Sequence, residues 1–346
     1  MPRTNDTGSL RQIGTSPSNH INMVSMKELS TETSSSRPRI AAVVVTYNRC
    51  ALLEGCLDAL IRQDRPLDEI LVIDNASTDS TAEMLEGKYN GRITHVRLEQ
   101  NVGGAGGFYE GIRLAYEKGQ DWIWVMDDDV EPRPDALSAL AGSPAFNDPN
   151  VGYLASLVLD SDLNVQTPHY RRFNWLMAAC PAVNKGSLVQ PLVPIEAAGF
   201  LGGMVRRESI DAVGLPIKDL FIYWDDTEFI FRVSRRFKVF LVPSSKVIHR
   251  FVWAPPPQRK ILGLVRRPSG IPYSQAWRTY YILRNSIFVR KKYVNPWLAP
   301  LIPIIVLVRP IGTTILFYDH KLARCKLLWR AAVDGVLGRL GRRVGH

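Results

Sequence analysis

Three consecutive carboxylates, Asp127, Asp128 and Asp129, follow a short apolar run at residues 122–126. Adjacent negative charges repel one another, so such a run is tolerated at the end of a strand where a divalent cation or solvent takes up the charge. Hard cations such as Mg²⁺ and Mn²⁺ prefer carboxylate oxygens, and Mg²⁺ commonly binds substrate phosphates as well. The run indicates a metal site for a phosphorylated substrate. A solvated acidic turn is an equal alternative on this motif alone.

Polar side chains also follow two earlier apolar runs. Tyr47 and Arg49 come after residues 40–46, where the ring could stack on a nucleobase and the guanidinium could pair with a phosphate. Asp74 follows the run at 69–73, and its carboxylate could accept hydrogen bonds from a nucleobase or ribose. The alternatives are a surface turn for the first pair and a helix-capping role for Asp74.

A glycine-rich segment at residues 101–108 begins with Asn101 and includes Gly103 and Gly104. Glycines let backbone N–H groups approach a phosphate, and the N-terminus of a following helix favours anions. The segment is not GxGxxG at the first strand–helix turn, and no lysine follows as in a P-loop. The pattern argues against dinucleotide binding and ATP hydrolysis, and a flexible turn is the alternative.

Residues 224–228, with the sequence WDDTE, place acids beside the ring of Trp224 at a predicted helix start. Acids there often only complement the helix dipole. A carboxylate near an acceptor hydroxyl, Asp225 or Asp226, could instead act as a general base. His249 ends a later apolar run. A lone histidine is more often structural, so His249 gains interest only beside the metal-like aspartates.

Apolar runs alternate with segments of helical spacing through the first third of the chain. Strands are predicted at 40–46, 69–73, 93–98 and 122–126, and helices at 51–63, from 80 onward and at 106–118. Farther on, helices are predicted at 206–213 and after the WDDTE motif, with short strands at 239–242 and 246–249. The alternation predicts right-handed βαβ units and an α/β fold with a mostly parallel sheet.

The predicted sheet would bring the candidate residues together. Ligands bind such sheets at the carboxyl ends of the strands. Tyr47, Asp74, Asn101 and Asp127 all follow predicted strand ends. We therefore expect these four side chains to share one site.

The composition suits a folded protein with one large domain or two modest ones. The 346 residues include four scattered cysteines and no CxxC pair, which favours a reducing, cytosolic setting over a disulfide framework or zinc knuckle. Residues 1–38 are rich in Ser, Thr, Asn and Pro, and we predict that they are disordered. They hold no signal-peptide core, so secretion is not expected.

Positive charge is concentrated in the C-terminal third. Residues 229–346 contain 23 Lys and Arg against only two acids, although the whole chain has a net charge of +10. Such asymmetry predicts an anionic partner. Residues 293–308 carry no charge and follow Arg290, Lys291 and Lys292. We interpret them as a segment on or partly within an anionic membrane, with a buried helix pair as the alternative and a true span as a minority one.

Taken in order, the motifs VVVTYNR, VIDNAST, NVGGAGGF, WVMDDDV and WDDTEF, followed by a histidine, resemble the inverting family 2 glycosyltransferases of the GT-A fold. The resemblance covers about residues 40–285 and is nearest to bacterial galactofuranosyltransferases and related rhamnosyltransferases. The pair Arg284 and Asn285 favours the first group, and residues 333–339 resemble the tail of the second. Three parts are expected: disordered 1–38, a GT-A domain at 39–275, and a basic helical region at 276–346.

The resemblance implies roles for the residues named above. Tyr47, Arg49 and Asp74 would hold the nucleoside of a UDP- or dTDP-linked sugar, and Asn101, Gly103 and Gly104 would lie near its ribose and diphosphate. Asp127, Asp129 and His249 would bind Mn²⁺ or Mg²⁺, with Asp128 in support. Asp226 would be the catalytic base, with Asp225 as the alternative, and Trp224 would line the sugar or acceptor pocket.

The resemblance also implies partners. The donor would be UDP-galactofuranose or dTDP-rhamnose, and the acceptor a polyprenyl-diphosphate-linked or other cell-envelope glycan. The protein would then lie peripherally at the cytoplasmic face of the bacterial inner membrane, and oligomers are possible. A distant alternative is nucleic-acid binding through Tyr280, Tyr281, Arg284 and Phe288, but no nucleic-acid motif is present and none is expected to bind. A catalytically inactive scaffold is a third hypothesis, against which the intact acidic pairs argue.

Overall fold

The computed structural model describes residues 37–173, 181–250, 260–261, 264–265, 271–293 and 297–345. Residues Pro38–His346 form one compact unit, and the following description concerns that unit. The prediction of disorder for residues 1–38 falls almost entirely outside the described residues.

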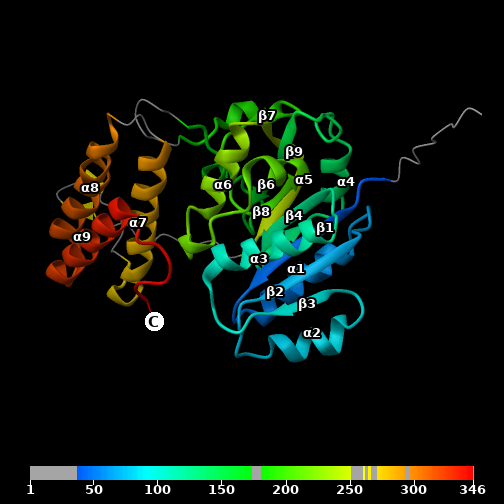
Figure 1. The fold of residues 1–346 in the computed structure, drawn as a ribbon, viewed down its shortest axis with the longest axis horizontal. Coiled ribbons are helices and arrows are strands. Elements are labelled where there is room, and N and C mark those ends of the chain that lie inside the picture. The colour runs from blue at the N-terminus through cyan, green and yellow to red at the C-terminus, as the bar shows by residue number, and fades with distance from the viewer. Residues whose placement is uncertain are drawn as a thin grey trace, which may run out of the picture. The chain divides into compact units, whose positions relative to one another are not determined.

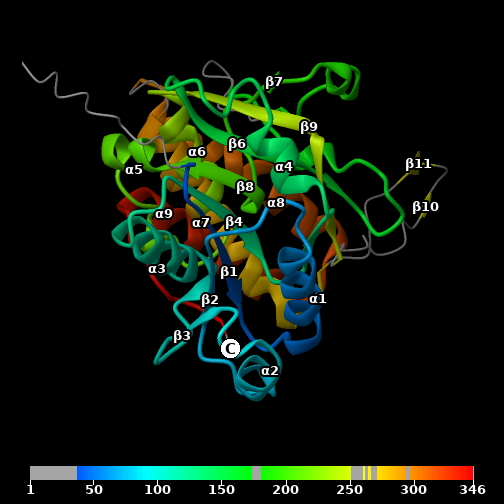
Figure 2. The ribbon, with the colours of Figure 1, turned by 90° about the vertical axis from the view of Figure 1, so that its right-hand side faces the viewer.

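The first part of the unit alternates strands and helices, as the sequence predicted. The elements are β1 (Ile40–Thr46), α1 (Cys50–Ile61), β2 (Glu69–Asp74), α2 (Thr81–Tyr89), β3 (Thr94–Arg97), α3 (Gly103–Glu117) and β4 (Trp122–Asp127). All seven residues of β1 are buried, and five of them are β-branched, which suits a central strand covered on both faces. Figure 2 shows α1 and α3 on the two sides of this part of the sheet.

The sheet is mixed rather than uniformly parallel. Its further strands are β5 (Val130–Pro132), β6 (Val151–Leu159), β7 (Val193–Pro194), β8 (Leu201–Arg206) and β9 (Lys238–His249). The order is β3-β2-β1-β4-β8-β6-β9-β5, and β7 also pairs with β9. The pairs among β3, β2, β1 and β4 and the pair β6–β9 are parallel, whereas β8 runs antiparallel to both β4 and β6. A mostly parallel α/β fold is therefore confirmed, with antiparallel strands in its second half.

One long strand replaces the two short strands predicted at 239–242 and 246–249. Strand β9 runs through both, and its register against β6 shifts between Val242 and Lys246. Pro243 lies in this gap. Proline cannot donate to a ladder and is confined in sheets to edges and bulges. The apolar pattern that predicted two short strands is interrupted at this bulge, but the strand continues through it.

The remaining helices surround the sheet or follow it. They are α4 (Ala136–Ala141), α5 (Arg207–Val213), α6 (Asp225–Ser234), α7 (Ala276–Tyr293), α8 (Ile302–Phe317) and α9 (Lys321–Leu337), with a small ladder of β10 (Lys260–Ile261) and β11 (Leu264–Val265). Figure 1 shows α7, α8 and α9 as the orange and red group. Their shared core includes Tyr280, Tyr281 and Ile287 of α7, with Leu328 and Ala331 of α9.

This helical group bears on two predictions. Tyr280, Tyr281 and Arg284 are fully buried, so they do not form the exposed aromatic surface on which nucleic-acid binding would depend. The buried-helix alternative for residues 293–308 does not describe the part that lies in α8, where only Ile302, Leu307 and Thr314 of the helix are buried. In the described parts of the chain, one helical stretch, Ala299–Phe317, is long and apolar enough to cross a membrane by length and composition, and only 17% of it is buried.

Candidate active site

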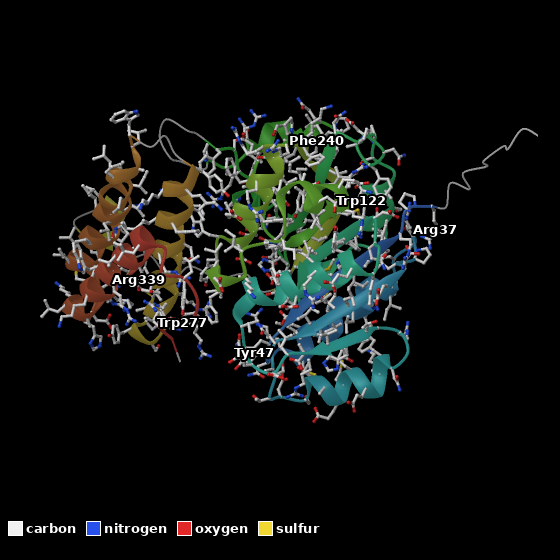
Figure 3. All side chains as sticks on the ribbon, viewed as in Figure 1. Arg37, Tyr47, Trp122, Phe240, Trp277 and Arg339 are labelled. Atoms are coloured by element: carbon white, nitrogen blue, oxygen red, sulfur yellow. The ribbon has the colours of Figure 1, made fainter. Side chains whose placement is uncertain are left out.

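Sheet register brings the predicted residues of the first strands to one edge. Thr46 pairs with Asp74 of β2, and Val45 pairs with Asp127 of β4. Figure 3 shows Tyr47 just past the carboxyl end of β1 and Trp122 at the opposite end, where β4 begins. Because neighbouring parallel strands end at the same edge, Tyr47, Asp74 and Asp127 lie at one rim, as the sequence predicted.

The three aspartates at the end of β4 and directly after it have different surroundings. Asp128 accepts hydrogen bonds from Thr46 Oγ1 at 2.8 Å and from Arg49 Nη1 at 3.1 Å. The same Arg49 nitrogen donates to Asp129 Oδ2 at 2.8 Å. Arg49 therefore offsets part of the charge of the acidic turn in this structure, although the sequence suggested that it pairs with a phosphate. Asp127 is partly exposed, whereas Asp128 and Asp129 are buried.

The acidic turn keeps more negative charge than Arg49 offsets. Burial, and then the charges of Asp129 and Asp128, raise the pKa of Asp127 well above its usual range. Burial also raises the pKa of Asp128 to about 6, against the opposing charge of Arg49. A raised carboxyl pKa means that the charged form lacks compensation. A divalent cation would supply that compensation.

Asp129 and His249 form the part of this region that best suits a metal ion. Antiparallel pairing of β5 with β9 sets Val130 opposite His249, which places His249 Nε2 3.3 Å from Asp129 Oδ1. That buried oxygen accepts no hydrogen bond, and buried polar atoms normally have a partner. A carboxylate oxygen and an imidazole nitrogen are suitable donors for Mn²⁺.

The predicted trio is not assembled as a three-ligand cluster. Among the described residues, no group of three or more His, Cys, Asp and Glu side chains is arranged to hold a metal ion. The residues present fit a cation that takes its remaining ligands from a bound molecule or water. A second histidine, His169, contacts His249 edge-on at 5.8 Å between ring centroids, and burial lowers its pKa to about 4. His169 is therefore neutral near pH 7.

Asp74 is fully buried at the end of β2, beneath partly exposed side chains. Its Oδ1 accepts a hydrogen bond from the Ser77 N–H at 2.8 Å, while Oδ2 has no hydrogen-bond partner and faces His95 Nε2 at 3.6 Å and Arg97 Nε at 4.0 Å. Burial alone would raise the pKa of Asp74, but the interactions with His95 and Ser77 outweigh it and lower the pKa. Asp74 is therefore a carboxylate with one unused acceptor atom.

The glycine-rich segment is fastened to β2 by Asn75. Asn75 Nδ2 donates to the Gly103 carbonyl at 3.0 Å, and its Oδ1 accepts from the Val102 N–H at 2.9 Å. Asn101 Oδ1 accepts from the Gly103 N–H at 2.8 Å. Gly104 is partly exposed, and a Cβ there would meet nothing within 4 Å. Open space beside a helix start leaves room for a phosphate.

Gly103 has a structural role that the sequence did not suggest. Its φ is +77°, and a Cβ at this position would lie 2.0 Å from the Phe221 carbonyl oxygen. That oxygen accepts a hydrogen bond from the Ala105 N–H at 3.1 Å. The glycine thus permits close packing against the segment that leads into the WDDTE motif.

The WDDTE motif starts helix α6. Trp224 is the residue before the helix, with φ +72°, and the Arg290 guanidinium lies over its ring at 5.4 Å. Asp225 is buried, whereas Asp226 is partly exposed. Trp224, Asp226 and Thr227 are thus the accessible members of the motif, and Asp226 is its accessible acid.

The two acids of this motif have raised pKa values. Burial, followed by the charge of Asp226, raises the pKa of Asp225 to about 7. Burial raises the pKa of Asp226 too, although hydrogen bonds from Thr227 and the charge of Arg171 oppose it. Asp225 also contributes to the raised pKa of Asp127. The charge of Asp225 at the start of α6 thus acts on the acidic turn at the end of β4.

Several residues of the site escaped the sequence analysis. Thr46 and Asn75 lie next to motif residues in the sequence. They could have been found by asking which polar neighbours hydrogen-bond to the acidic turn and to the glycine-rich segment. His169 and Arg171 lie in an irregular region with no pattern to single them out. Asn285 was noted only within a resemblance, and its contacts with residues 220–223 could not be anticipated from sequence.

The chain was compared with known proteins. Residues 41–211 match the profile described as Glycosyl transferase family 2. "Galactofuranosyltransferase GlfT1" of Mycolicibacterium smegmatis is 33% identical over 199 residues, which are 57% of this chain and 65% of that protein. "dTDP-rhamnosyl transferase RfbF" of Shigella flexneri is 26% identical over 305 residues, 87% of this chain and 97% of that protein. The chain thus spans just under two thirds of the length of the first relative.

The fold is also similar to that of solved glycosyltransferases. "Mannosyltransferase PcManGT from Pyrobaculum calidifontis in complex with GDP-Man and Mn2+" has a TM-score of 0.50 and 16% identity, over 88% of this chain and 89% of that one. At that identity the likeness concerns the fold alone. The profile match covers the elements that carry Asp74, the glycine-rich segment and the three aspartates. These findings confirm the resemblance noted in the motifs: residues 41–211 of the chain form a glycosyl transferase family 2 domain.

Proposed function

We propose that the protein transfers a sugar from a nucleotide-sugar donor to a hydroxyl of a glycan acceptor, with inversion at the anomeric carbon. One observation carries the proposal: Gly103 of the glycine-rich segment packs on the Phe221 carbonyl, and α6 begins four residues later with buried Asp225 and partly exposed Asp226. This contact supports a base and a diphosphate-binding site at the same rim of the sheet. A single displacement at this rim needs no enzyme nucleophile.

Asp226 is the general base of the proposal. It would remove the proton from the attacking hydroxyl as the new glycosidic bond forms. Its raised pKa makes it a stronger base than an ordinary aspartate and moves it towards the operating pH. Asp225, with its pKa raised to about 7 and its side chain buried, is the alternative.

A divalent cation, Mn²⁺ or Mg²⁺, is the proposed cofactor. Asp129 and His249 would hold it together with Asp127, while Asp128 and Arg49 fix the acidic turn. When bound, such an ion acts as a Lewis acid that stabilises the departing diphosphate. The mannosyltransferase of similar fold, solved with GDP-Man and Mn²⁺, supports the assignment.

The donor site is proposed for the rim formed by β1, β2 and the glycine-rich segment. Tyr47 is 43% exposed, and its ring is available to stack on a base. Asp74 Oδ2, which has no hydrogen-bond partner, would accept a hydrogen bond from the nucleoside once His95 and Arg97, the two side chains that face it, move aside. Asn101, Gly103 and Gly104 would lie near the ribose and diphosphate, and Trp224 would line the sugar pocket.

UDP-galactofuranose is the first candidate donor and dTDP-rhamnose the alternative. The galactofuranosyltransferase relative has the higher identity, 33%, whereas the rhamnosyltransferase relative matches over more of the chain, 87%. The test is transfer by the purified protein from each donor with Mn²⁺, followed by NMR of the product. Product from UDP-galactofuranose with an inverted anomeric centre is expected. A retained configuration would overturn the mechanism.

The acceptor is proposed to be lipid-linked and presented at an anionic membrane. Helix α8 exposes Ile304, Ile305 and Val308, on a region where Lys and Arg greatly outnumber acids. An exposed apolar face with basic surroundings suits the interface of an anionic bilayer. Two of the residues that we predicted to anchor the protein at lipid head groups instead make hydrogen bonds within the protein. Lys291 donates to the Val336 carbonyl, and Lys292 donates to Glu228. We therefore propose that docking rests on α8 and takes place at the cytoplasmic face of the bacterial inner membrane.

A further inference from the structure

The segment that leads into the WDDTE motif has an unfavourable backbone. Phe221, Tyr223 and Trp224 have φ values of +66°, +65° and +72°. Large L residues rarely adopt positive φ, because the Cβ atom crowds the following carbonyl oxygen. Three of them within four residues persist only where surrounding contacts determine the conformation. The contacts that hold residues 220–224 are therefore important for the start of α6.

One buried amide on α7 supplies most of these contacts. Asn285 Nδ2 donates to the carbonyl oxygens of Leu220 at 3.0 Å, Ile222 at 2.9 Å and Tyr223 at 2.8 Å. Asn285 is fully buried, so water does not compete for these acceptors. The NH₂ group has two hydrogens, so two of the three carbonyls share one of them in a bifurcated hydrogen bond.

Arg284 fixes the orientation of that amide. Its Nε donates to Asn285 Oδ1 at 2.8 Å, which directs the NH₂ group at the segment. Its Nη2 also donates to the Leu220 carbonyl at 2.9 Å. The fully buried guanidinium lies over the ring of Tyr281 at 4.8 Å. The pair thus acts as a rigid unit built into the core of the helical group.

Two more contacts from the end of α7 hold the motif itself. Lys292 Nζ donates to Glu228 Oε1 at 3.1 Å, and the Tyr293 hydroxyl donates to the same oxygen. Glu228 is fully buried in the first turn of α6. One helix from the C-terminal region therefore holds both the segment before Asp226 and the turn that contains it.

The opposite side of the segment contacts the proposed donor site. The Phe221 carbonyl accepts from the Ala105 N–H, and Gly103 packs directly on it. Residues 220–224 thus lie between Asn285 and the glycine-rich segment. A change in their backbone would alter the direction in which α6 presents Asp226.

We propose that Asn285 is a positioning residue for the transfer reaction: it holds residues 220–224 in their strained conformation and thereby places Asp226 for proton removal. It acts through the backbone and does not touch the substrate. The inference rests on the proposed role of Asp226 as base. It predicts that loss of the Asn285 amide lowers kcat far more than it weakens nucleotide binding, which depends mainly on strand ends.

The experiment compares Asn285→Ala with Tyr280→Phe. Tyr280 lies on the same helix, is also fully buried, and donates its hydroxyl to Asp334 at 2.6 Å, away from the segment. Both changes remove buried hydrogen bonds from one core, so both lower Tm. We expect Asn285→Ala to lower kcat about a hundredfold, because small misplacements have effects of that order, with UDP affinity in the presence of Mn²⁺ unchanged. Tyr280→Phe should retain kcat.

Hydrogen exchange gives a second readout that needs no turnover. Amides of residues 221–230 should exchange faster in Asn285→Ala than in Tyr280→Phe at matched Tm loss. Asn285→Ser, which keeps one donor, should fall between wild type and Asn285→Ala, and it replaces Asn285→Ala if that variant does not fold. Equal kcat and equal exchange in the Asn285 and Tyr280 variants would overturn the proposal.

The two proposals fail in different ways. If Asp226→Asn retains transfer, the role of Asp226 as base is wrong, whatever Asn285 does. If Asp226→Asn is inactive while Asn285→Ala behaves like Tyr280→Phe, only the positioning role of Asn285 is wrong.

Discussion

The two acidic motifs of the site are held in place by different means. The aspartates after β4 follow directly from strand register, because β1 pairs with both β2 and β4 and ends at the same rim. Asp226 instead follows a strained segment that depends on side chains of α7, about sixty residues later in the chain. The first motif is therefore as robust as the sheet, whereas the second depends on a few buried hydrogen bonds. Substitutions at the acidic turn should weaken metal and nucleotide binding, whereas substitutions that displace Asp226 should lower kcat with little change in nucleotide binding.

The largest effect on the rate of transfer is expected from a change in the acidic turn, at the proposed metal ligand Asp129. Asp129→Ala removes the carboxylate whose unused oxygen faces His249. Transfer should fall by about a thousandfold or more, since a Lewis acid is worth several kcal/mol, and Mn²⁺ should no longer increase UDP affinity in calorimetry. The control is Asp135→Ala, an exposed acid before α4. Unchanged dependence of UDP binding on Mn²⁺ would contradict the metal role.

Two neighbouring glycines, at the contact between the glycine-rich segment and the segment before α6, should differ in their effect on stability. Gly103→Ala should lower the free energy of unfolding by about 2–3 kcal/mol, because it combines a positive φ with overpacking against the Phe221 carbonyl. Gly104→Ala meets nothing within 4 Å and should be neutral or stabilising by up to about 1 kcal/mol. Urea unfolding of both variants measures the difference. Equal stabilities would mean that the segment does not pack on Phe221 as described.

The buried acid of the second motif gives a pH-dependent contrast. The pKa of Asp225 is raised to about 7 in the folded protein, against about 4 in an unfolded chain. Between these values the folded state binds the extra proton, so the free energy of unfolding falls as pH rises from about 4 to about 7. Asp225→Asn should flatten this fall. Urea unfolding in EDTA across this pH range checks the sign, and an identical slope in the variant would refute the shift.

The smallest effect on stability is expected on α8. Ile304→Asp and Ile305→Asp change exposed residues, so the free energy of unfolding should move by no more than about 0.5 kcal/mol. Sedimentation with phosphatidylglycerol vesicles should nevertheless drop sharply. Val189→Asp, at an apolar residue that is 89% exposed outside this helical region, is the matched control. Full vesicle binding by the α8 variants would rule out the docking face.

The sequence predicted the sheet side of the site well and the other side only in part. Periodicity identifies β1, β2 and β4, and parallel strands must end together, so Tyr47, Asp74 and Asp127 could be placed at one rim beforehand. The antiparallel position of β8 and the continuity of β9 through its bulge depend on tertiary pairing, which local patterns do not encode. The packing of Gly103 on Phe221 is of the same kind, because it joins segments more than a hundred residues apart.

The surroundings of the motif residues were the least predictable part. The sequence predicted that Arg49 binds a phosphate, yet in the structure it forms ion pairs with Asp128 and Asp129. Arg290 and Lys292 were predicted to anchor the protein at lipid head groups. In the structure, Arg290 lies over the Trp224 ring and Lys292 forms an ion pair with Glu228. In each case a charged side chain meets a partner distant in sequence. Charge patterns therefore did not predict the individual contacts of these side chains.

The most direct test of the central claim is Asp226→Asn, measured for both sugar transfer and UDP binding with Mn²⁺. The substitution keeps the size of the side chain and removes only its basicity. We expect transfer to fall by about a thousandfold, within the range for loss of a general base, while UDP affinity stays within about twofold. Transfer at the wild-type rate would contradict the account, because the acid that α7 and the strained segment present to the rim would then have no part in the reaction.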